Sequence, residues 1–431
     1  MRNKIIIGCL LLGALSVKAQ DGRFSIEEYK QRVLEYSRQI KQSAEERIAM
    51  QHAVKAAKTA FFPAVDFSGN YQYRINKYEL GMGDGIPGIE MDHNTYSLGA
   101  TVNQPIYAGG QIYNNYKAAQ VQGEIASQAE ELTTDNIIYT ADLNYWSAAA
   151  RKGMYEVMCQ YVDIVQELAN VLTIRFNDGQ ISKTDLLQVE SRLKEAELNK
   201  SSAYKDYQIA LQNMNSLMGV SPMAPIIVTD SITMYQMLPL QVGEDVALRN
   251  RPEYTITQLD IEYQKRQINL SKAKYNPTLA IGFQGSWGTP MLNVKGSDLL
   301  WTPAVFASLK IPLFHWGARF KEVNSQKALL RSKEYAMDNT RDQIANEVAN
   351  AWTSLKENTK QITVAEEACK IAEENLDLNT FSYNEGKLPI LDVLSAQLSW
   401  IQSYSSLIQT WYQQKASLAQ YNKAIGLRRL Q

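Results

Sequence analysis

Two carboxylates in matching sequence contexts are the strongest candidates for chemistry in this chain. Asp185 stands six residues after Gly179, and Asp392 stands six residues after Gly386. Carboxylates that converge on a narrow passage attract cations and raise one another's pKa. A carboxylate near the start of a helix instead accepts hydrogen bonds from backbone N–H groups and suits the helix dipole. The sequence leaves both roles open for Asp185 and Asp392.

The sequence lacks the motifs that are typical of hydrolases. The chain has no G-x-S-x-G or H-E-x-x-H element, and His52, His93 and His315 are far apart and have no ligand-like spacing. An exported hydrolase is therefore the weakest function class for this chain. The net charge of −1 argues against nucleic acid as a partner. We expect no catalytic residue, no cofactor and no metal site.

The first 19 residues predict a secretory signal, with basic Arg2 and Lys4, an apolar stretch at 5–15 and a small-residue cleavage site before Gln20. A lipoprotein signal ending at Cys9 is the alternative, but its apolar run is too short. No later run of 18 or more apolar residues follows, so no membrane-spanning helix is expected. The chain is predicted to be exported, to the periplasm, the medium or an outer membrane.

The cysteines left after removal of the signal, Cys159 and Cys369, are too few for a disulfide framework. We expect Cys369 to be a small core residue, with a disulfide to Cys159 as the alternative.

The chain is duplicated at a fixed offset of 207 residues. The tip motif Phe176-Asn177-Asp178-Gly179 recurs as Tyr383-Asn384-Glu385-Gly386, Gln104-Pro105 with Gly110 recurs as Ile311-Pro312 with Gly317, and Gly219 recurs as Gly426. A fixed offset across separate landmarks indicates two related half-molecules. We expect a signal at 1–19, a first repeat at 20–219, a connector at 220–243, a second repeat at 244–426 and a tail at 427–431.

Long helices dominate each repeat. Residues 111–176 and 317–383 contain few helix breakers, and apolar residues recur every seven positions. These heptads are Val348, Leu355, Ile362, Cys369, Leu376 and Tyr383, and Ala141, Ala148, Tyr155, Val162, Ala169 and Phe176. The pattern predicts coiled-coil seams, which gives Tyr383 packing as its default role. A helix of this length extends for about 100 Å, so the helices must build something elongated.

Shorter helices complete each repeat. A turn at Gly179 or Gly386 is expected to lead into a second helix that ends near Gly219 or Gly426. The result is two hairpins with tips at 177–185 and 384–392. Further single helices are expected at 25–60 and 244–275.

Between the helices the apolar period changes to two, which predicts β-strands at about 62–76, 95–107, 278–288 and 302–313. Each has about the length of a tilted membrane-spanning strand. Aromatic residues gather near the strand ends: Tyr73, Tyr78, Tyr96, Tyr107, Trp287 and Trp301. Soluble hairpins packed on a core are the alternative. Four strands cannot close a membrane barrel, whereas three chains would pool twelve.

These features together resemble the TolC family of outer-membrane efflux proteins over about residues 24–428, including the Arg251-Pro252-Glu253 element that opens a helix. The resemblance implies a mixed α and β membrane protein: a homotrimer with a 12-stranded β-barrel and a long α-helical coiled-coil barrel. It implies a passive exit duct, in the outer membrane and extending into the periplasm, for a tripartite efflux pump or type I secretion system. An exported coiled-coil scaffold or adaptor without a pore would explain the helices but not the strands.

The resemblance also implies partners and site residues. The partners are a periplasmic adaptor (membrane fusion) protein, an inner-membrane transporter of the RND, ABC or MFS type, and outer-membrane lipid. At the periplasmic gate the tip tyrosine falls on Tyr383, its partner aspartate on Asp185 and the first pore-ring aspartate on Asp392. The second pore-ring aspartate falls on Ser395, and the arginine of the closing network falls on Leu388. These departures predict at most one aspartate ring and a differently held gate.

Overall fold

The computed structural model describes residues 22–76, 79–80, 89–234, 238–290, 294 and 298–427. The predicted signal with Cys9, residue Tyr78 and most of the predicted tail lie outside the described residues, as do parts of the loops at 81–94 and 289–300. The chain forms two compact units. The first unit comprises Met1–Arg38, Thr134–Ala247 and Asn346–Gln431, and the second comprises Gln39–Thr133 and Leu248–Ala345. Each unit draws on both repeats.

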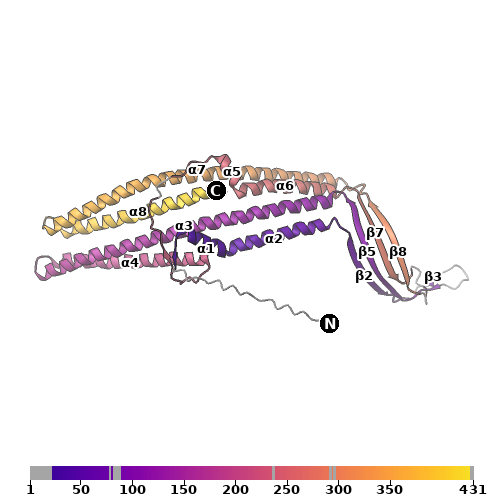
Figure 1. The fold of residues 1–431 in the computed structure, drawn as a ribbon, viewed down its shortest axis with the longest axis horizontal. Helices are drawn as coiled ribbons and strands as arrows, with labels where there is room; N and C mark the ends of the chain where they lie inside the picture. Colours follow the sequence, from indigo (N-terminus) through magenta and orange to yellow (C-terminus); the bar gives the residue numbers. More distant parts are fainter. Residues whose placement is uncertain are drawn as a thin grey trace, which may run out of the picture. The chain divides into compact units, whose positions relative to one another are not determined.

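Two helical hairpins form most of the first unit. Helix α3 (Gln111–Asn177) turns into α4 (Lys183–Met218), and α7 (Ala318–Asn384) turns into α8 (Ile390–Ala424). The two helices of each hairpin lie side by side (Figure 1). Both long helices contain 67 residues, and their bounds differ by the same 207 positions (318 minus 111 and 384 minus 177). The duplication seen in the sequence is therefore also present in the helix boundaries.

The α7 seam is buried as its heptad predicts. Its six heptad residues, from Val348 to Tyr383, are each at most 8 % exposed. In α3 the heptad residues Ala141, Ala148 and Ala169 are buried, but Tyr155, Val162 and Phe176 are half-exposed. Tyr161, Val165 and Leu172, which lie outside the heptad frame, are buried instead. A straight helix has 3.6 residues per turn and drifts from a seven-residue frame by about 20° per heptad. The second part of α3 therefore follows the predicted seam only in part.

A short parallel pair of strands ties the chain's beginning to the connector. Strand β1 (Arg23–Phe24) pairs with β6 (Ile227–Val228). The buried Tyr145 hydroxyl of α3 lies 2.6 Å from an Asp230 carboxylate oxygen and 2.9 Å from the Phe24 carbonyl. The Asp230 carboxylate also accepts a hydrogen bond from the Ile26 N–H at 3.0 Å. The connector is thus fastened to α3 by polar contacts.

Two single helices expected from the sequence are each broken into two. Residues 25–60 form α1 (Ile26–Tyr36) and α2 (Arg38–Thr59), because Ser37 leaves the helical conformation, with φ −42° and ψ 116°. Residues 244–275 form α5 (Glu244–Asn250) and α6 (Pro252–Ala273). Here the break follows from Pro252, which occupies the first helical position and disfavours helical conformation in the residue before it.

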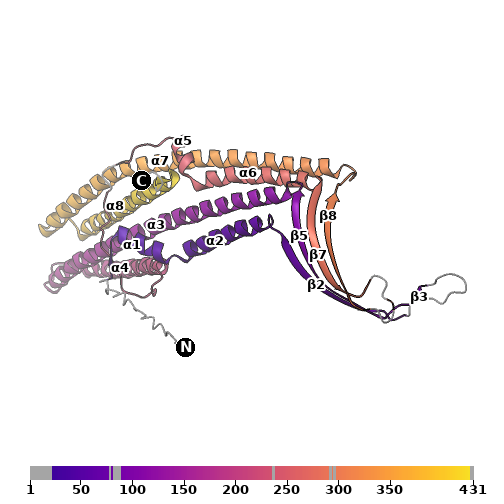
Figure 2. The same ribbon diagram turned by 45° about the vertical axis from the view of Figure 1, so that its right-hand side comes forward.

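A four-stranded sheet is the main feature of the second unit. Its strands are β2 (Ala64–Tyr73), β5 (Asn94–Ala108), β7 (Thr278–Gly288) and β8 (Leu300–Lys310), antiparallel in the order β2-β5-β7-β8 (Figure 2). A separate two-stranded sheet is formed by β3 (Glu79–Leu80) and β4 (Ile89–Glu90). The outer edges of β2 and β8 have no strand partner among the described residues.

The two faces of this sheet differ in polarity. One face carries rows of apolar side chains that run across all four strands, such as Val65, Val102, Phe283 and Val305. Val65 is 71 % exposed and Val305 is 82 % exposed, although both are apolar. The opposite face carries rows of small and polar residues, such as Ser68, Gly99, Ser286 and Thr302. The face that a soluble protein would bury is therefore left open.

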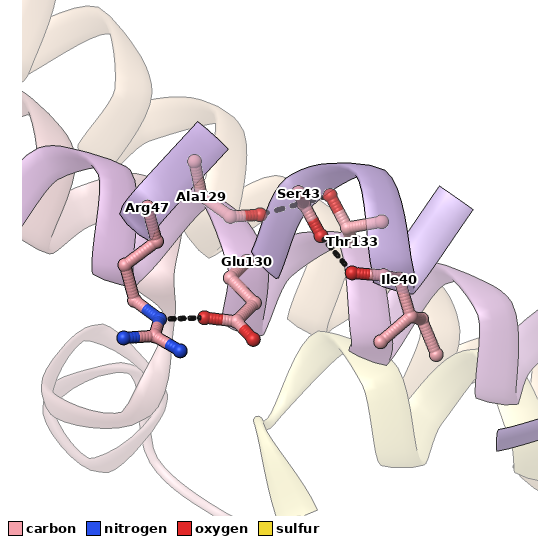
Figure 3. A network of polar contacts seen from close by, with 6 residues as sticks. All are labelled: Ile40, Ser43, Arg47, Ala129, Glu130 and Thr133. Atoms are coloured by element: carbon pink, nitrogen blue, oxygen red, sulfur yellow. Dashed lines mark hydrogen bonds and ion pairs between the residues drawn. The ribbon is translucent and has the colours of Figure 1, made fainter. Parts of the chain in front are cut away.

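Polar contacts join the helices of the second unit. The Arg47 guanidinium of α2 pairs with the Glu130 carboxylate of α3, flanked by hydroxyl-to-carbonyl hydrogen bonds within each helix (Figure 3). Between α6 and α7, the Lys333 ammonium lies 2.7 Å from the Asp260 carboxylate. Among the described residues, no helix has both the length and the hydropathy needed to cross a membrane.

Candidate functional site

The tips of the two hairpins have the same backbone turn. Gly179 and Gly386 have φ values of +70° and +71°, which residues with a Cβ rarely adopt. Past each glycine an N–H reaches back to a carbonyl five residues earlier, from Gln180 to Arg175 at 2.8 Å and from Lys387 to Ser382 at 2.9 Å. A Cβ on either glycine would meet nothing within 4 Å. Both glycines are therefore required by the turn and not by crowding.

Asp185 forms a capping box at the start of α4. Its carboxylate accepts hydrogen bonds from the Ser182 hydroxyl at 2.9 Å and from the Ser182 N–H at 3.3 Å. In return, the Asp185 N–H donates to the Ser182 hydroxyl at 3.2 Å. This reciprocal pair satisfies N–H groups that the helix itself leaves free. The carboxylate of Asp185 is thus occupied by its own helix.

Asp392 occupies the matching position on α8 but has no such contacts. Its helix begins after Pro389, which has no side-chain donor or acceptor and makes no capping hydrogen bond. Asp392 is exposed, and its carboxylate has no hydrogen-bond or ion-pair partner among the described residues. The two aspartates therefore differ in kind, although their sequence motifs match. The carboxylate of Asp392 is available to solutes.

Tyr383 contacts a residue that the sequence analysis did not identify. The Arg175 guanidinium lies over the Tyr383 ring, with its central carbon 5.1 Å from the ring centroid. The same guanidinium donates a hydrogen bond to the Asn384 side-chain oxygen at 3.4 Å. Arg175 is the basic residue in the last turn of α3, where a cation also suits the helix dipole. The contact joins the end of α3 to the end of α7.

The other predicted tip residues lie apart from this contact. No hydrogen bond joins Tyr383 to Asp185 within the described chain, so that pairing stays a prediction for the assembled protein. Ser395 is exposed, and its hydroxyl donates to the Leu391 carbonyl of its own helix at 2.8 Å. Leu388 is half-buried just before Pro389. The tip thus contains an arginine, but on α3 and not at 388.

The remaining candidate side chains form no site. Cys159 is half-buried and Cys369 is buried, and both are free thiols. Burial raises the pKa of the Cys369 thiol, as expected of a core cysteine. Across the described ranges, no group of His, Cys, Asp and Glu side chains could hold a metal ion.

Comparison with known proteins identifies the family. A family model described as "Outer membrane efflux protein" matches residues 30–220 and 245–427. The chain belongs to the outer membrane efflux protein family. The match takes in both hairpins and all four long strands, so the efflux protein is recognised over both of its repeats.

Individual relatives have low sequence identity to this chain, but the similarity extends over most of its length. The chain is 21 % identical over 365 residues to the outer membrane efflux protein BepC of Brucella suis, covering 83 % of this chain and 75 % of BepC. It is 19 % identical over 336 residues to the alkaline protease secretion protein AprF of Pseudomonas aeruginosa, covering 75 % and 68 %. The open-state MtrE outer membrane channel of Neisseria gonorrhoeae has a TM-score of 0.78 at 15 % identity, covering 93 % of this chain and 88 % of MtrE.

These findings confirm the main predictions made from the sequence. The efflux protein has the mixed α and β fold of its family, is located in the outer membrane and acts as an efflux channel. Its family and fold are those of channel proteins, and its function involves pump or secretion partners in general.

Proposed function

We propose that the protein works as a homotrimer whose three sheets close one twelve-stranded barrel, the exit duct of a tripartite pump or type I secretion system. The observation that carries this proposal is the sheet with one apolar face, one polar face and two unpaired edges. In lipid, unpaired backbone groups cost several kcal/mol each, so an open edge is not tolerated. Further strands from other copies would satisfy both edges.

The composition of the two faces supports the orientation of the barrel. The apolar face, with Val65, Phe283 and Val305, suits contact with lipid tails. The polar face, with Asp66, Ser68 and Thr302, suits a water-filled interior. Three copies of four strands give twelve, an even number within the known range of outer-membrane barrels.

The hairpin tips are proposed to form the periplasmic entrance. Three Asp392 carboxylates, one from each copy, would form a ring that attracts cations. The bare, exposed state of this carboxylate supports this role, whereas the capping box of Asp185 supports a structural role there. Ser395 and Leu388 supply no second ring and no arginine.

The contact between Arg175 and Tyr383 is proposed to hold the entrance shut. It links α3 with α7, so a movement that separates the two hairpins must break it. At a partly exposed site such a contact contributes about 0.5–1 kcal/mol. A latch of this strength is weak enough for a partner protein to release.

The proposed partners are a periplasmic adaptor, an inner-membrane transporter of the RND, ABC or MFS type, and outer-membrane lipid. The adaptor would contact the tip at 384–392. BepC is an efflux protein and AprF is a secretion protein, so the proposal includes both an efflux pump and a secretion system. We propose no catalytic activity.

Conductance and mass measurements test the proposal together. The purified protein in a planar bilayer should give small, cation-preferring current steps, and light scattering in detergent should give the mass of three chains. A folded protein that is monomeric in detergent and does not insert into lipid would contradict the duct and favour a scaffold.

A further inference from the structure

The internal duplication predicts how two copies of this chain join. Two offsets relate the strands of the repeats. Helix boundaries and Pro105 with Pro312 set an offset of 207 from β5 to β8. The segments Phe61-Phe62-Pro63 and Tyr275-Asn276-Pro277, which precede β2 and β7, set an offset of 214.

The two offsets pass an internal check. In the first repeat Ala64 of β2 lies opposite Asn103 of β5. Adding 214 and 207 gives Thr278 and Lys310, which lie opposite each other in the ladder of β7 and β8. The duplication therefore preserves strand register to the residue.

The pairing of β5 with β7, which joins the two repeats, can then serve as a template for the pairing between two copies. Strand β5, the second strand of the first repeat, pairs with β7, the first strand of the second repeat. The equivalent contact for β8 requires the first strand of another first repeat, and within one chain β2 lies at the opposite edge of the sheet. A second copy of the chain supplies it.

We propose that β8 of one copy pairs antiparallel with β2 of the next in the register of β5 with β7. Before the bulge after Pro105, the residue numbers of each β5–β7 pair sum to 385. Moving from β5 to β8 adds 207, and moving from β7 to β2 subtracts 214. The residue numbers of each proposed β8–β2 pair therefore sum to 378. Ser308 then lies opposite the next copy's Asn70, Ala307 opposite Tyr71 and Leu309 opposite Gly69. This inference rests on the proposed trimeric duct.

The side-chain directions agree with this register. Residues 305, 307 and 309 lie on the apolar face of β8, and residues 69, 71 and 73 lie on the apolar face of β2. A sum of 378 places apolar face beside apolar face across the junction. A slip of one residue would place the apolar face of one copy beside the polar face of the next.

Charge provides an independent argument. Asp66 is the one charged residue of β2, and Lys310 is the one charged residue of β8. Both are exposed on the polar face and form no ion pair within the described chain. In the proposed register Lys310 lies opposite Ser68, so Asp66 is its diagonal neighbour, about 7–8 Å away and within reach of a lysine. A shift to a sum of 380 would separate the two charges, whereas a sum of 376 would place them directly opposite each other. The charges therefore argue against 380, and the cysteine pairs decide between 376 and 378.

Paired cysteines test the register. In the full-length protein with Cys159→Ser and Cys369→Ala, we would oxidise Ser308→Cys/Asn70→Cys and Ala307→Cys/Tyr71→Cys. Adjacent pairs alternate between two hydrogen-bonding geometries, and both Cα separations are within disulfide range. The matched controls are Ser308→Cys/Ser68→Cys and Ser308→Cys/Gln72→Cys, together with Ser308→Cys alone.

The expected result is dithiothreitol-sensitive two-chain and three-chain species from the 308/70 or 307/71 pair, with little from the controls. More linkage at 308/68 or 308/72 would overturn the register. A trimer by light scattering that no pair links would overturn this edge contact while leaving the trimer intact. A monomer by light scattering, also in the parent protein, would instead overturn the proposed function.

A charge exchange gives a second measurement. Asp66→Lys and Lys310→Asp should each lower the temperature at which the trimer dissociates on a denaturing gel. The double exchange should restore much of the loss. Equal losses that simply add would contradict the proximity of the two side chains.

Discussion

The Arg175 guanidinium carbon lies 5.1 Å from the centroid of the Tyr383 ring, and the same guanidinium reaches the Asn384 side chain. The duplication does not repeat this contact, because the residue matching Arg175 in the second repeat is Ser382. The arginine contact at the tip is therefore asymmetric: the first hairpin supplies the arginine, and the second hairpin supplies the tyrosine and asparagine.

Removing this cation should ease opening of the entrance. Arg175→Met keeps the length of the side chain but loses a contact of about 0.5–1 kcal/mol, which corresponds to about a two- to five-fold change in an equilibrium constant per copy. We expect longer open times in single-channel recordings. Arg175→Lys, which keeps the charge over the ring, is the control and should lie between the parent and Arg175→Met. Equal open times in all three proteins would exclude the latch.

The two tip aspartates should respond differently to mutation. Asp392→Ala should weaken the preference for cations, measured as a shift in reversal potential under a salt gradient, with little loss of stability. Asp185→Ala removes a capping box and should lower the free energy of unfolding by about 1 kcal/mol, with selectivity retained. A larger selectivity change from Asp185→Ala than from Asp392→Ala would reverse these assignments.

An arginine at 388 should change the gate. Leu388 stands where the resemblance places the arginine of the closing network, so opening should depend more on adaptor contacts at 384–392 than on breaking a salt bridge. We expect Leu388→Arg to lower conductance and slow opening. Leu388→Met, similar in size and uncharged, should leave both unchanged. If Leu388→Arg behaved like the parent, this view of the gate would lose its support.

Two glycines with positive φ allow backbone strain and side-chain crowding to be compared in their effect on stability. Gly179 and Gly219 have φ values of +70° and +71°, so alanine is strained at both by about 1–2 kcal/mol. A Cβ on Gly179 would meet open space, whereas one on Gly219 would lie 1.9 Å from the Tyr36 ring. Gly219→Ala should therefore lower Tm more than Gly179→Ala. Gly219→Ala combined with Tyr36→Ala should remove the excess; no recovery would show that crowding is not its cause.

Acid should weaken one contact of the second unit. The Tyr275 hydroxyl, 3.0 Å away, and then Lys274 hold the pKa of Glu322 below its ordinary value. Because the folded-state pKa is the lower one, this carboxylate stabilises the fold above its ordinary pKa, and the contribution is lost as pH falls through the lowered value.

Tyr275→Phe keeps the ring but removes the hydrogen bond, so the pKa of Glu322 should rise toward its ordinary value. The parent should then be more stable than Tyr275→Phe at neutral pH, and the difference in Tm should shrink toward about pH 3. In a Glu322→Gln background the same tyrosine change should give a difference without this pH dependence. A gap that widens in acid would contradict the assignment.

The regular parts of the fold follow from local sequence. Heptads and low proline content predict α3 and α7, and alternation predicts the four long strands, because period and length are local properties. The helix breaks at Ser37 and Pro252 differ in their sequence signals. At Pro252 the Arg251-Pro252-Glu253 element indicates a helix start inside the single helix expected at 244–275. Ser37 is buried and has no neighbouring proline or glycine to mark a break.

The site was less accessible to sequence reasoning. The difference between Asp185 and Asp392 could have been read from the residue three positions earlier, since Ser182 can cap a helix and Pro389 cannot. The contact of Arg175 with Asn384 spans 209 positions and two repeats. No local pattern indicates it, because it depends on how the two hairpins pack within the first unit.

The two free edges of the sheet have a genetic consequence. They differ in sequence and charge, so in the proposed trimer each copy joins its neighbours head to tail, and such a contact must close into a ring or continue indefinitely. A copy whose β8 edge is blocked by a proline in place of Ser308 still offers an intact β2 edge to a normal neighbour. It would join normal copies through its β2 edge and prevent the ring from closing. A mutation that removes only one edge should therefore be dominant in a cell that makes both forms of the chain.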